Sequence, residues 1–407
     1  MKITDGGVTA AKGFKAAGVE AGIKYENRKD MAMIFSDKPC TVAGTFTSNV
    51  VKAAPVIWDM KVVRENKSAQ AVVVNTGIAN AATGKQGMDY CEFEAETAGR
   101  LLNIPKESVI IGSTGVIGAQ LDKNKLEAGI KALVPKLSDT REAAREASVA
   151  IMTTDTKNKE AAVEIEIDGR TVTVGGMSKG SGMIHPNMCT MLCYITTDID
   201  IDGELLQKAL SEDIKDTFNM ITVDGDTSTN DTVIVMANGE AGNGKITEEN
   251  GDYRKFAEAL HYVNETLAKM MAADGEGASK LLEVTVINAG NKEKARLLAR
   301  SVAGSLLTKA AMFGNDSNFG RILCSLGYSG ADFDPDKVDI WYEADGKKML
   351  IFSDGVQAPY DEAEATKLLD HKEVRIIADM KEGDAKASAW GCDLTYDYVK
   401  INADYRS

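Results

Sequence analysis

A glycine-rich segment, residues 175–192, holds the side chains best suited to chemistry. It reads GGMSKGSGMIHPNMCTML and contains Lys179 and Thr190. A threonine hydroxyl is a poor nucleophile until a base removes its proton, and the α-amino group of the same residue is one base that proteins use. A free α-amino group has a pKa of ~7.7–8, so it is partly neutral near pH 7. Thr190 would carry a free α-amino group only after the bond between Cys189 and Thr190 is cleaved, by an N→O acyl shift and hydrolysis of the resulting ester.

Residue types alone leave other interpretations of this segment open. The segment lacks the G-x-x-x-x-G-K-[ST] spacing of a phosphate-binding loop, and no helix-forming run follows it. It also fits an ordinary glycine-rich turn in which Thr190 simply opens the next strand. The chain has only three histidines, His185, His261 and His371, so a serine–histidine–aspartate enzyme has few candidates. We expect His185, which precedes a proline, to make a structural hydrogen bond.

Two further segments place small or acidic residues beside apolar runs. Residues 109–116 read VIIGSTGV, a strand that we expect to run into a tight turn with exposed N–H groups. Residues 224–231 read DGDTSTND, but a calcium-binding EF-hand loop needs glycine at its sixth position and glutamate at its twelfth. This chain has Thr229 and Val235 there, so we expect a structural or site-shaping loop. The six cysteines are scattered, which predicts free thiols and no metal site.

The elements that must position these residues alternate between strands and helices, which predicts an α/β or α+β fold. Expected strands are Met31–Phe35, Ala71–Asn75, Ser108–Gly112, Val163–Ile167, Thr171–Val174, Thr232–Ala237, Leu282–Asn288, Val338–Tyr342 and Val374–Ala378. Expected helices are Glu92–Leu102, Arg141–Met152, Glu204–Phe218, Tyr253–Met271, Lys292–Lys309 and Asp361–Leu369. Asp168-Gly169 is a favoured two-residue hairpin turn between two of these strands.

Length and composition restrict the class of protein. The chain has 407 residues, 44% hydrophobic and 27% charged, with a net charge of −14. This length predicts two or three domains, and the acidic balance argues against nucleic acid or an anionic membrane as a partner. The first residues lack the apolar core of a signal peptide, and no apolar run is long enough to span a bilayer. Together with the scattered cysteines, these features predict a cytoplasmic protein.

The glycine-rich segment resembles the self-cleavage site of the ornithine acetyltransferases, the glutamate N-acetyltransferase family of arginine biosynthesis, whose pattern is close to KGSGMIHPNMATML. Other segments resemble the family in the same order along the chain. They are Gly7–Phe14, Asn75–Asn80, Ser113–Gly118, Met152–Thr156, Val223–Asp231, Asp274–Ala278, Gly314–Asp316, Asn318–Arg321 and Ile401–Ser407. The resemblance therefore covers essentially the whole chain and favours the nucleophile interpretation of Thr190.

The resemblance implies roles for particular residues. Thr190 would be the nucleophile of both self-cleavage and catalysis, and Thr114 with Gly115 would form the oxyanion hole. The residues implied in substrate binding are Thr153, Lys179, Thr190, Glu276, Asn402 and Ser407. Lys179 suits the α-carboxylate shared by the substrates, and Glu276 suits the ammonium of ornithine or would orient the leaving amine. Because Asn402 and Ser407 lie at the end of the chain, the C-terminal segment must fold into the site. Two residues depart from the family pattern: Cys189 stands where alanine is usual, and Ser407 where threonine is common.

The resemblance also implies an activity and an assembly. Acetyl transfer from N-acetylornithine to glutamate would release ornithine and pass through acetyl-Thr190, with acetyl-CoA as a second donor in a bifunctional subtype. The precursor would cut itself into an alpha chain, 1–189, with the oxyanion loop, and a beta chain, 190–407. Two of each would form a heterotetramer without a cofactor. The implied fold is a two-domain α/β sandwich with an N-terminal-nucleophile site between the cleaved chains. A self-processing aminopeptidase or amidase and an uncleaved binding protein for acidic amino acids are the alternatives.

Overall fold

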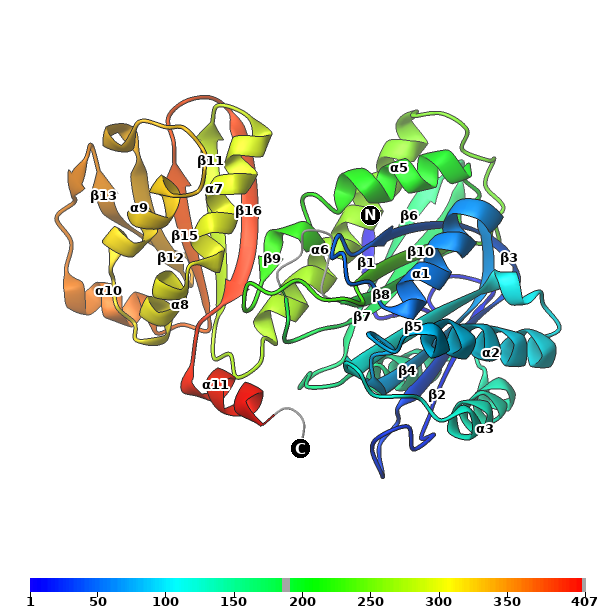
Figure 1. The fold of residues 1–407 in the computed structure, drawn as a ribbon. Helices are drawn as coiled ribbons and strands as arrows, with labels where there is room; N and C mark the ends of the chain where they lie inside the picture. Colours follow the sequence, from blue (N-terminus) through cyan, green and yellow to red (C-terminus); the bar gives the residue numbers. More distant parts are fainter. Residues whose placement is uncertain (185–190, 405–407) are drawn as a thin grey trace. The chain divides into compact units, whose positions relative to one another are not determined.

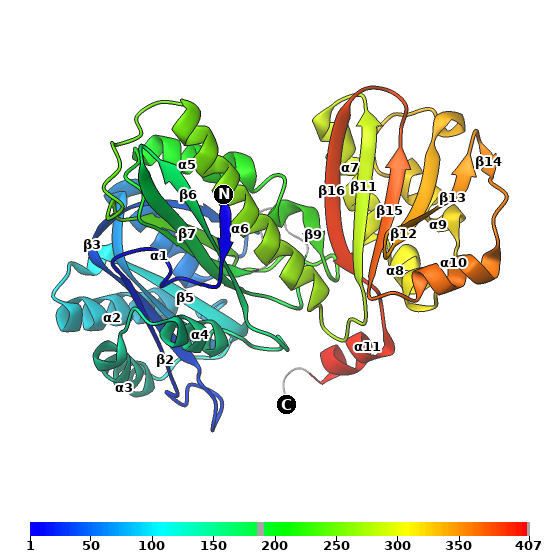
Figure 2. The same cartoon turned by 180° about the vertical axis from the view of Figure 1, so that it is seen from behind.

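The computed structural model describes residues 1–184 and 191–404. Strands and helices alternate along the chain, so the predicted mixed α/β class is confirmed (Figures 1 and 2). The chain forms two compact units, which we describe separately. The first contains the described residues of 1–180, 187–215 and 227–267, and the second those of 181–186, 216–226 and 268–407.

The first unit is built on a nine-stranded mixed sheet in the described residues, with the strand order β1-β6-β7-β8-β10-β3-β4-β5 and β2 paired with β3. The strands are β1 (Lys2–Thr4), β2 (Phe14–Val19), β3 (Met31–Phe46), β4 (Ser68–Ile78), β5 (Val109–Val116), β6 (Lys159–Ile167), β7 (Arg170–Lys179), β8 (Leu192–Thr197) and β10 (Thr232–Ala237). Pairs β8–β10 and β4–β5 are parallel, and the other pairs are antiparallel. The elements after residue 190 thus enter a sheet formed mostly by earlier strands.

The hairpin of β6 and β7 follows the predicted turn. Asp168 and Gly169 connect the strands with φ angles of 51° and 67°, the left-handed values that the favoured two-residue hairpin turn requires. The ladder then runs from Ile167 opposite Arg170 to Lys159 opposite Ser178. This register places Lys179 at the end of β7, whose last five residues are the first five of the glycine-rich segment.

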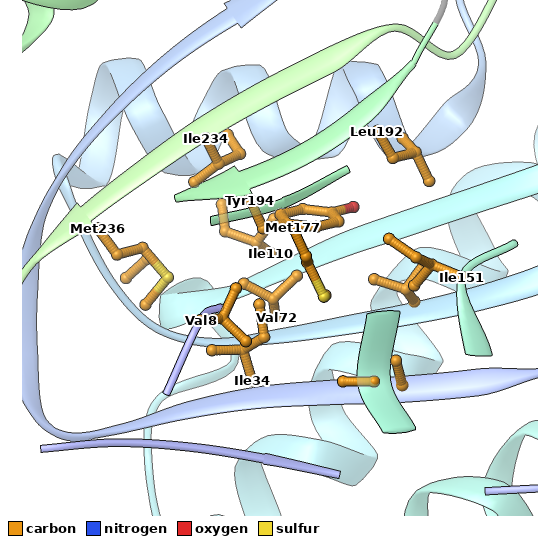
Figure 3. Close-up of a cluster of buried hydrophobic side chains, with 14 of the residues drawn as sticks. Val8, Ile34, Val72, Ile110, Ile151, Met177, Leu192, Tyr194, Ile234 and Met236 are labelled. Atoms are coloured by element: carbon orange, nitrogen blue, oxygen red, sulfur yellow. The ribbon is translucent and has the colours of Figure 1, made fainter. Parts of the chain in front are cut away.

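The core of the first unit lies between the two halves of this sheet. Figure 3 shows Ile34, Val72 and Ile110, from β3, β4 and β5, facing Met177, Tyr194 and Ile234, from β7, β8 and β10. The alternate side chains of β3, β4 and β5 form a second buried cluster with two helices, α2 (Lys85–Leu102) and α3 (Lys123–Leu133). Burial on both faces explains why these strands read as continuous apolar runs.

The remaining helical elements of the first unit cover the sheet or connect its strands. They are α1 (Ala54–Lys61), the π-helical turn η1 (Val62–Asn66), η2 (Lys106–Ser108), η3 (Val134–Lys136), α4 (Arg141–Ala150), α5 (Gly203–Asp213) and α6 (Gly251–Ala273), whose residues up to Leu267 belong to this unit. Val263 and Leu267 of α6 approach Gly176 of β7, so α6 packs on the outer face of that half of the sheet. The first unit therefore has the layers helix, sheet, sheet and helix, as expected of the implied α/β sandwich.

The second unit contains a seven-stranded sheet in the described residues, with the order β14-β13-β12-β15-β11-β16-β9. Its strands are β9 (Ile221–Thr222), β11 (Leu281–Ala289), β12 (Asp339–Ala344), β13 (Lys347–Ser353), β14 (Val356–Gln357), β15 (Glu373–Asp379) and β16 (Ala385–Cys392). Its helices are η4 (Phe218–Met220), α7 (Lys292–Gly304), α8 (Leu306–Phe313), α9 (Phe319–Gly327), η5 (Pro335–Lys337), α10 (Glu362–Leu369) and α11 (Tyr396–Ala403). In Figure 2, α7, α8 and α9 lie behind the strands, so these helices share one face of the sheet.

Three of the expected helices end earlier than predicted, and the one expected over Arg141–Met152 ends only two residues early, at Ala150. The single helix expected over Lys292–Lys309 is two helices, because Ser305 adopts an extended conformation and its hydroxyl accepts a hydrogen bond from the N–H of Thr308. This is an N-cap, which starts a new helix. The helix expected to reach Phe218 ends at Asp213. Among the described residues, no helix has the length and apolar character needed to cross a membrane.

Candidate functional site

Three of the residues implied as site residues meet in the first unit. Lys179, at the end of β7, donates hydrogen bonds from Nζ to Oγ1 of Thr153, 2.9 Å away, and to Oγ1 of Thr114, 3.2 Å away. Lys179 is 8% exposed. Residues from β7, from β5 and from the loop after α4 thus converge on one ammonium group. A cation beside two hydroxyls is suited to bind a carboxylate.

Thr114 and Gly115 lie within β5, not in a tight turn after it. The parallel ladder with β4 continues to Val116, with an irregularity at which Ile78 pairs with both Thr114 and Val116. Gly115 has a φ of +132°, and a Cβ there would collide with the backbone of Gly77. Our expectation of a tight turn was therefore wrong. The close approach of β4 requires glycine, and a local irregularity of the ladder is a common feature beside active sites.

Buried amide side chains hold this end of β5. Nδ2 of Asn230 donates to the carbonyl oxygens of Ala79, at 2.6 Å, and Ser113, at 2.8 Å. The hydroxyl of Ser113 donates to Oδ1 of Asn75 at 2.6 Å. Asn230 belongs to the 224–231 segment, so part of that segment does shape the surroundings of Thr114. Among the described residues, no group of three or more histidine, cysteine or acidic side chains could hold a metal ion.

A buried carboxylate connects the segments that carry Thr153 and Lys179. Asp155 accepts hydrogen bonds from the N–H of Gly180 at 2.7 Å, from the N–H of Thr153 at 3.0 Å and from Nζ of Lys159 at 2.7 Å. Burial alone would raise the pKa of Asp155. The charges of Lys179 and Lys159, together with these hydrogen bonds, hold the pKa below its ordinary value instead. Asp155 is therefore ionised at neutral pH.

A second acidic side chain lies near the start of β8. Asp231 is fully buried, and burial raises its pKa well above the ordinary value. The N–H of Met191, the hydroxyls of Thr47 and Ser228 and the charge of Lys179 lower the pKa only in part. The N–H of Thr232 donates to the carbonyl oxygen of Met191 at 2.9 Å. A buried carboxyl group with a raised pKa thus lies beside the residue that follows Thr190 in the sequence.

Two other implied site residues meet in the second unit. Nδ2 of Asn402, in α11, donates to Oε2 of Glu276 at 2.7 Å. The N–H of Glu276 donates to the carbonyl oxygen of Ser181 at 2.8 Å, and the carboxyl group of Glu276 occupies the space that a Cβ at Gly182 would need. Asn402 thus brings α11 to Glu276, and the expected folding of the C-terminal segment into the site stays a prediction. The small residues of the glycine-rich segment therefore allow Glu276 to approach.

Further acidic and phenolic groups surround Glu276. Asp224 accepts hydrogen bonds from the N–H groups of Met183, at 2.6 Å, and Ile184, at 2.9 Å. Burial raises the pKa of Asp224, and these hydrogen bonds lower it in part. Burial also raises the pKa of Tyr398, and the nearby charges of Asp224 and Glu276 add to the rise. Asp224 thus fixes the path of the glycine-rich segment, as expected of a site-shaping loop.

The remaining predicted residues lie outside the described residues. They are Cys189 and Thr190, the expected cleavage pair and nucleophile, together with His185 and the terminal Ser407. Their roles remain predictions. Thr114, Thr153 and Lys179 form one cluster in the first unit, and Glu276 and Asn402 form another in the second.

Comparison with known proteins identifies the family. The model of the ArgJ family matches residues 15–407. The chain belongs to the ArgJ family. It is 50% identical over 397 residues to the arginine biosynthesis bifunctional protein ArgJ of Thermotoga neapolitana, covering 97% of this chain and 99% of that protein. It is 48% identical over 407 residues to the protein of the same name from Caldanaerobacter subterraneus subsp. tengcongensis, covering 100% of both chains.

A solved relative agrees with this assignment. The crystal structure of arginine biosynthesis bifunctional protein ArgJ from Bacillus halodurans is 45% identical to this ArgJ-family chain, with a TM-score of 0.50. The match covers 97% of that chain but 52% of this one. The solved chain is therefore about half as long as the one described here.

Sequence reasoning missed several residues that hold the ArgJ-family site together. Asp155 and Lys159 were not singled out, although Asp155 lies in a segment that resembles the family. Asn230 lies in a run expected to be a structural or site-shaping loop, but this residue was not singled out. An aspartate followed four residues later by a lysine, next to an apolar strand, was the available signal. That pattern is also typical of a solvent-exposed pair.

Proposed function

We propose that this ArgJ-family chain transfers the acetyl group of N-acetylornithine to glutamate through an acetyl-Thr190 intermediate. Family membership makes the chain an acetyltransferase of arginine biosynthesis. The observation that carries the finer proposal is the convergence of Lys179, Thr153 and Thr114. This arrangement offers a cation for a carboxylate beside a residue expected to stabilise an oxyanion.

The proposed reaction has two half-reactions. Oγ1 of Thr190 loses its proton to its own α-amino group and attacks the acetyl carbonyl of N-acetylornithine. The tetrahedral intermediate collapses as the nitrogen of ornithine takes that proton and leaves, which gives acetyl-Thr190. The amine of glutamate then attacks the ester carbonyl, and Thr190 recovers its hydroxyl. Thr114 and Gly115 stabilise the negative oxygen in both steps, an effect worth ~3–4 kcal/mol per donor in proteases.

Substrate recognition follows from the charges of the two clusters. Both substrates carry an α-carboxylate, which Lys179 binds next to the hydroxyl of Thr153. Glu276 binds the side-chain ammonium of ornithine, and Asn402 orients Glu276 through the bond between Nδ2 and Oε2. Ser407 contributes a further hydroxyl. Because relatives are named bifunctional, we extend the proposal to acetyl-CoA as a second acetyl donor that yields N-acetylglutamate.

Thr190 acts in this way only after cleavage of the bond to Cys189. We therefore propose an alpha chain of residues 1–189 and a beta chain of residues 190–407, paired as a heterotetramer in the cytoplasm. The solved relative supports this division, because its chain is about half as long as this one. Half the length is what a cut near residue 190 of 407 produces.

Mass spectrometry of the purified protein, followed by an acetyl-transfer assay, tests this proposal. Cleavage predicts fragments of about 20 and 23 kDa in proportion to residue number, the larger beginning with Thr190. The Thr190→Ala variant should stay at 43.6 kDa and should not transfer acetyl groups. A Thr190→Ala variant that still transfers acetyl groups would contradict the assignment of Thr190 as the nucleophile.

The same assay separates the alternatives. Acetate release that does not depend on glutamate would indicate an aminopeptidase or amidase. Glutamate binding by a full-length, uncleaved protein without acetyl exchange would indicate a binding protein.

A further inference from the structure

The Asp155–Lys159 pair is the most completely buried ion pair near the candidate site. Oδ1 of Asp155 and Nζ of Lys159 are 2.7 Å apart, and their side chains are 0% and 1% exposed. Placing two charges in the protein interior costs several kcal/mol per ion before their attraction is counted. Such a pair is therefore a poor choice for stability alone, and its contacts suggest what else it does.

Asp155 fixes the backbone on both sides of the Lys179 ammonium. One carboxyl oxygen accepts the N–H of Gly180, the residue after Lys179, and the other accepts the N–H of Thr153. Thr153 in turn receives a hydrogen bond from Nζ of Lys179. The loop before β6 and the end of β7 are thus joined through one carboxylate, and both carry a residue implied in substrate binding.

Lys159 pairs with the carboxylate of Asp155. Its Nζ donates to Asp155 and to the carbonyl oxygen of Lys157, 3.1 Å away. The charges of Lys179 and Lys159 and these hydrogen bonds together lower the pKa of Asp155 against the effect of burial. The ionised carboxylate accepts the N–H groups of Thr153 and Gly180, and this holds the two segments between which the hydrogen bond from Lys179 to Thr153 runs.

We propose that Asp155 and Lys159 are positioning residues for acetyl transfer: Asp155 holds Thr153 and the end of β7 that carries Lys179 in place, and Lys159 holds the carboxylate of Asp155. The inference rests on the proposed function, in which Lys179 binds the substrate carboxylate. Neither residue touches the substrate. Their effect should therefore appear in the KM for the acetyl donor more than in kcat.

Two single variants and their combination test this proposal. Lys159→Met removes the ammonium that holds the Asp155 carboxylate, so the hold of Asp155 on Thr153 and Gly180 weakens and the KM for N-acetylornithine rises about tenfold or more. Asp155→Asn keeps the shape but cannot accept both backbone N–H groups, so the same KM rises. The double variant Asp155→Asn/Lys159→Met removes both buried charges. It should recover thermal stability relative to the single variants but keep the raised KM, because the anchor of Thr153 is still missing.

Glu160→Gln is the matched control. Glu160 follows Lys159 on β6, its side chain is 4% exposed, and it pairs with Arg141 at 2.9 Å. This variant also breaks an ion pair of the same strand, one with a buried carboxylate and a partly exposed arginine, but no contact joins Glu160 to Lys179 or Thr153 among the described residues. We expect a lower unfolding temperature with KM and kcat unchanged.

The outcomes are distinguishable. Folded Asp155→Asn with a wild-type KM would overturn the positioning role, as would a double variant that recovers stability and KM together. If the Lys159→Met variant does not fold, the KM values of Asp155→Asn and of the double variant still test the positioning role. A wild type without acetyl transfer would contradict the proposed function instead. Calorimetric titration of N-acetylornithine into wild type and Asp155→Asn then decides the positioning role, and a wild type that does not bind this ligand overturns both.

Discussion

Single residues at the candidate site are recognisable by type, but their partners are not. Lys179, Thr114 and Thr153 were named from the resemblance, and they do meet. Asp155 and Lys159 were missed because a charged residue is mostly solvent-exposed, and only the packing of β6 and β7 buries these two. The residues expected to react or to bind substrate can therefore be predicted from the sequence, whereas the residues that hold them in place depend on tertiary packing.

Asn230 offers a test of such a holding role. Replacing Asn230 with Ala leaves the carbonyl oxygens of Ala79 and Ser113 without their amide donor, which costs about 1–3 kcal/mol of unfolding free energy. Because Ser113 precedes Thr114, we also expect kcat for acetyl transfer to fall about tenfold or more. Urea unfolding and steady-state kinetics measure the two effects.

Asn238 is a control at the other end of β10. It is as buried as Asn230, at 8% exposed, and its Nδ2 donates to the carbonyl oxygen of Lys12 and to Oγ of Ser36. Asn238→Ala should lose comparable stability and keep kcat. Equal kcat values for the two alanine variants would show that Asn230 is only structural.

Turns and strands were predicted well where the local sequence determines their bounds and poorly where tertiary packing determines them. The Asp168-Gly169 turn and strand Thr232–Ala237 have the predicted bounds. Strand β3, expected to end at Phe35, continues to Phe46 through Pro39, because a register shift between Phe35 and Cys40 accommodates the polar residues and the proline. No local pattern distinguishes such a continuation from a loop.

Helix α2 carries a buried glutamate that should make stability depend on pH. Glu94 is fully buried, its carboxyl oxygens have no hydrogen-bond partner among the described residues, and burial raises its pKa to about 8. Glu94 stays protonated in the folded protein while the unfolded chain ionises, so stability falls as pH rises from about 4.5 to 8. The loss is about 5 kcal/mol, at about 1.4 kcal/mol per pKa unit for the shift from 4.5 to about 8.

Glu94→Gln removes this dependence. Thermal unfolding at pH 5 and pH 8 should show a variant more stable than wild type at pH 8 and little different at pH 5. Glu96→Gln, on an exposed side of the same helix with a side chain 56% exposed, is the control and should show no such gain at pH 8. A Glu94→Gln variant destabilised equally at both pH values would mean that Glu94 is ionised in the folded protein.

At the scale of the molecule, the proposed cut does not separate the compact units. Strands β8 and β10 come after residue 190, yet β8 pairs with β7 and β10 pairs with β3, both from residues before the cut. Leu192, Tyr194, Ile234 and Met236 also lie in the core shared with Ile34 and Val72 (Figure 3). The sequence predicts a cut before Thr190 but not this arrangement, because pairing between distant strands leaves no local pattern.

This arrangement predicts that the two fragments remain one folded body after cleavage. To separate, they would have to break both edges of the β8–β10 pair and expose the apolar side chains between the halves of the sheet, at about 25 cal/mol per Å² of apolar surface. Native size-exclusion chromatography should therefore show the fragments of about 20 and 23 kDa in one peak, with both bands on a denaturing gel. Urea should release them only at the concentration where circular dichroism reports unfolding of the sheet. Fragments that separate in native buffer, with their secondary structure retained, would contradict the shared sheet.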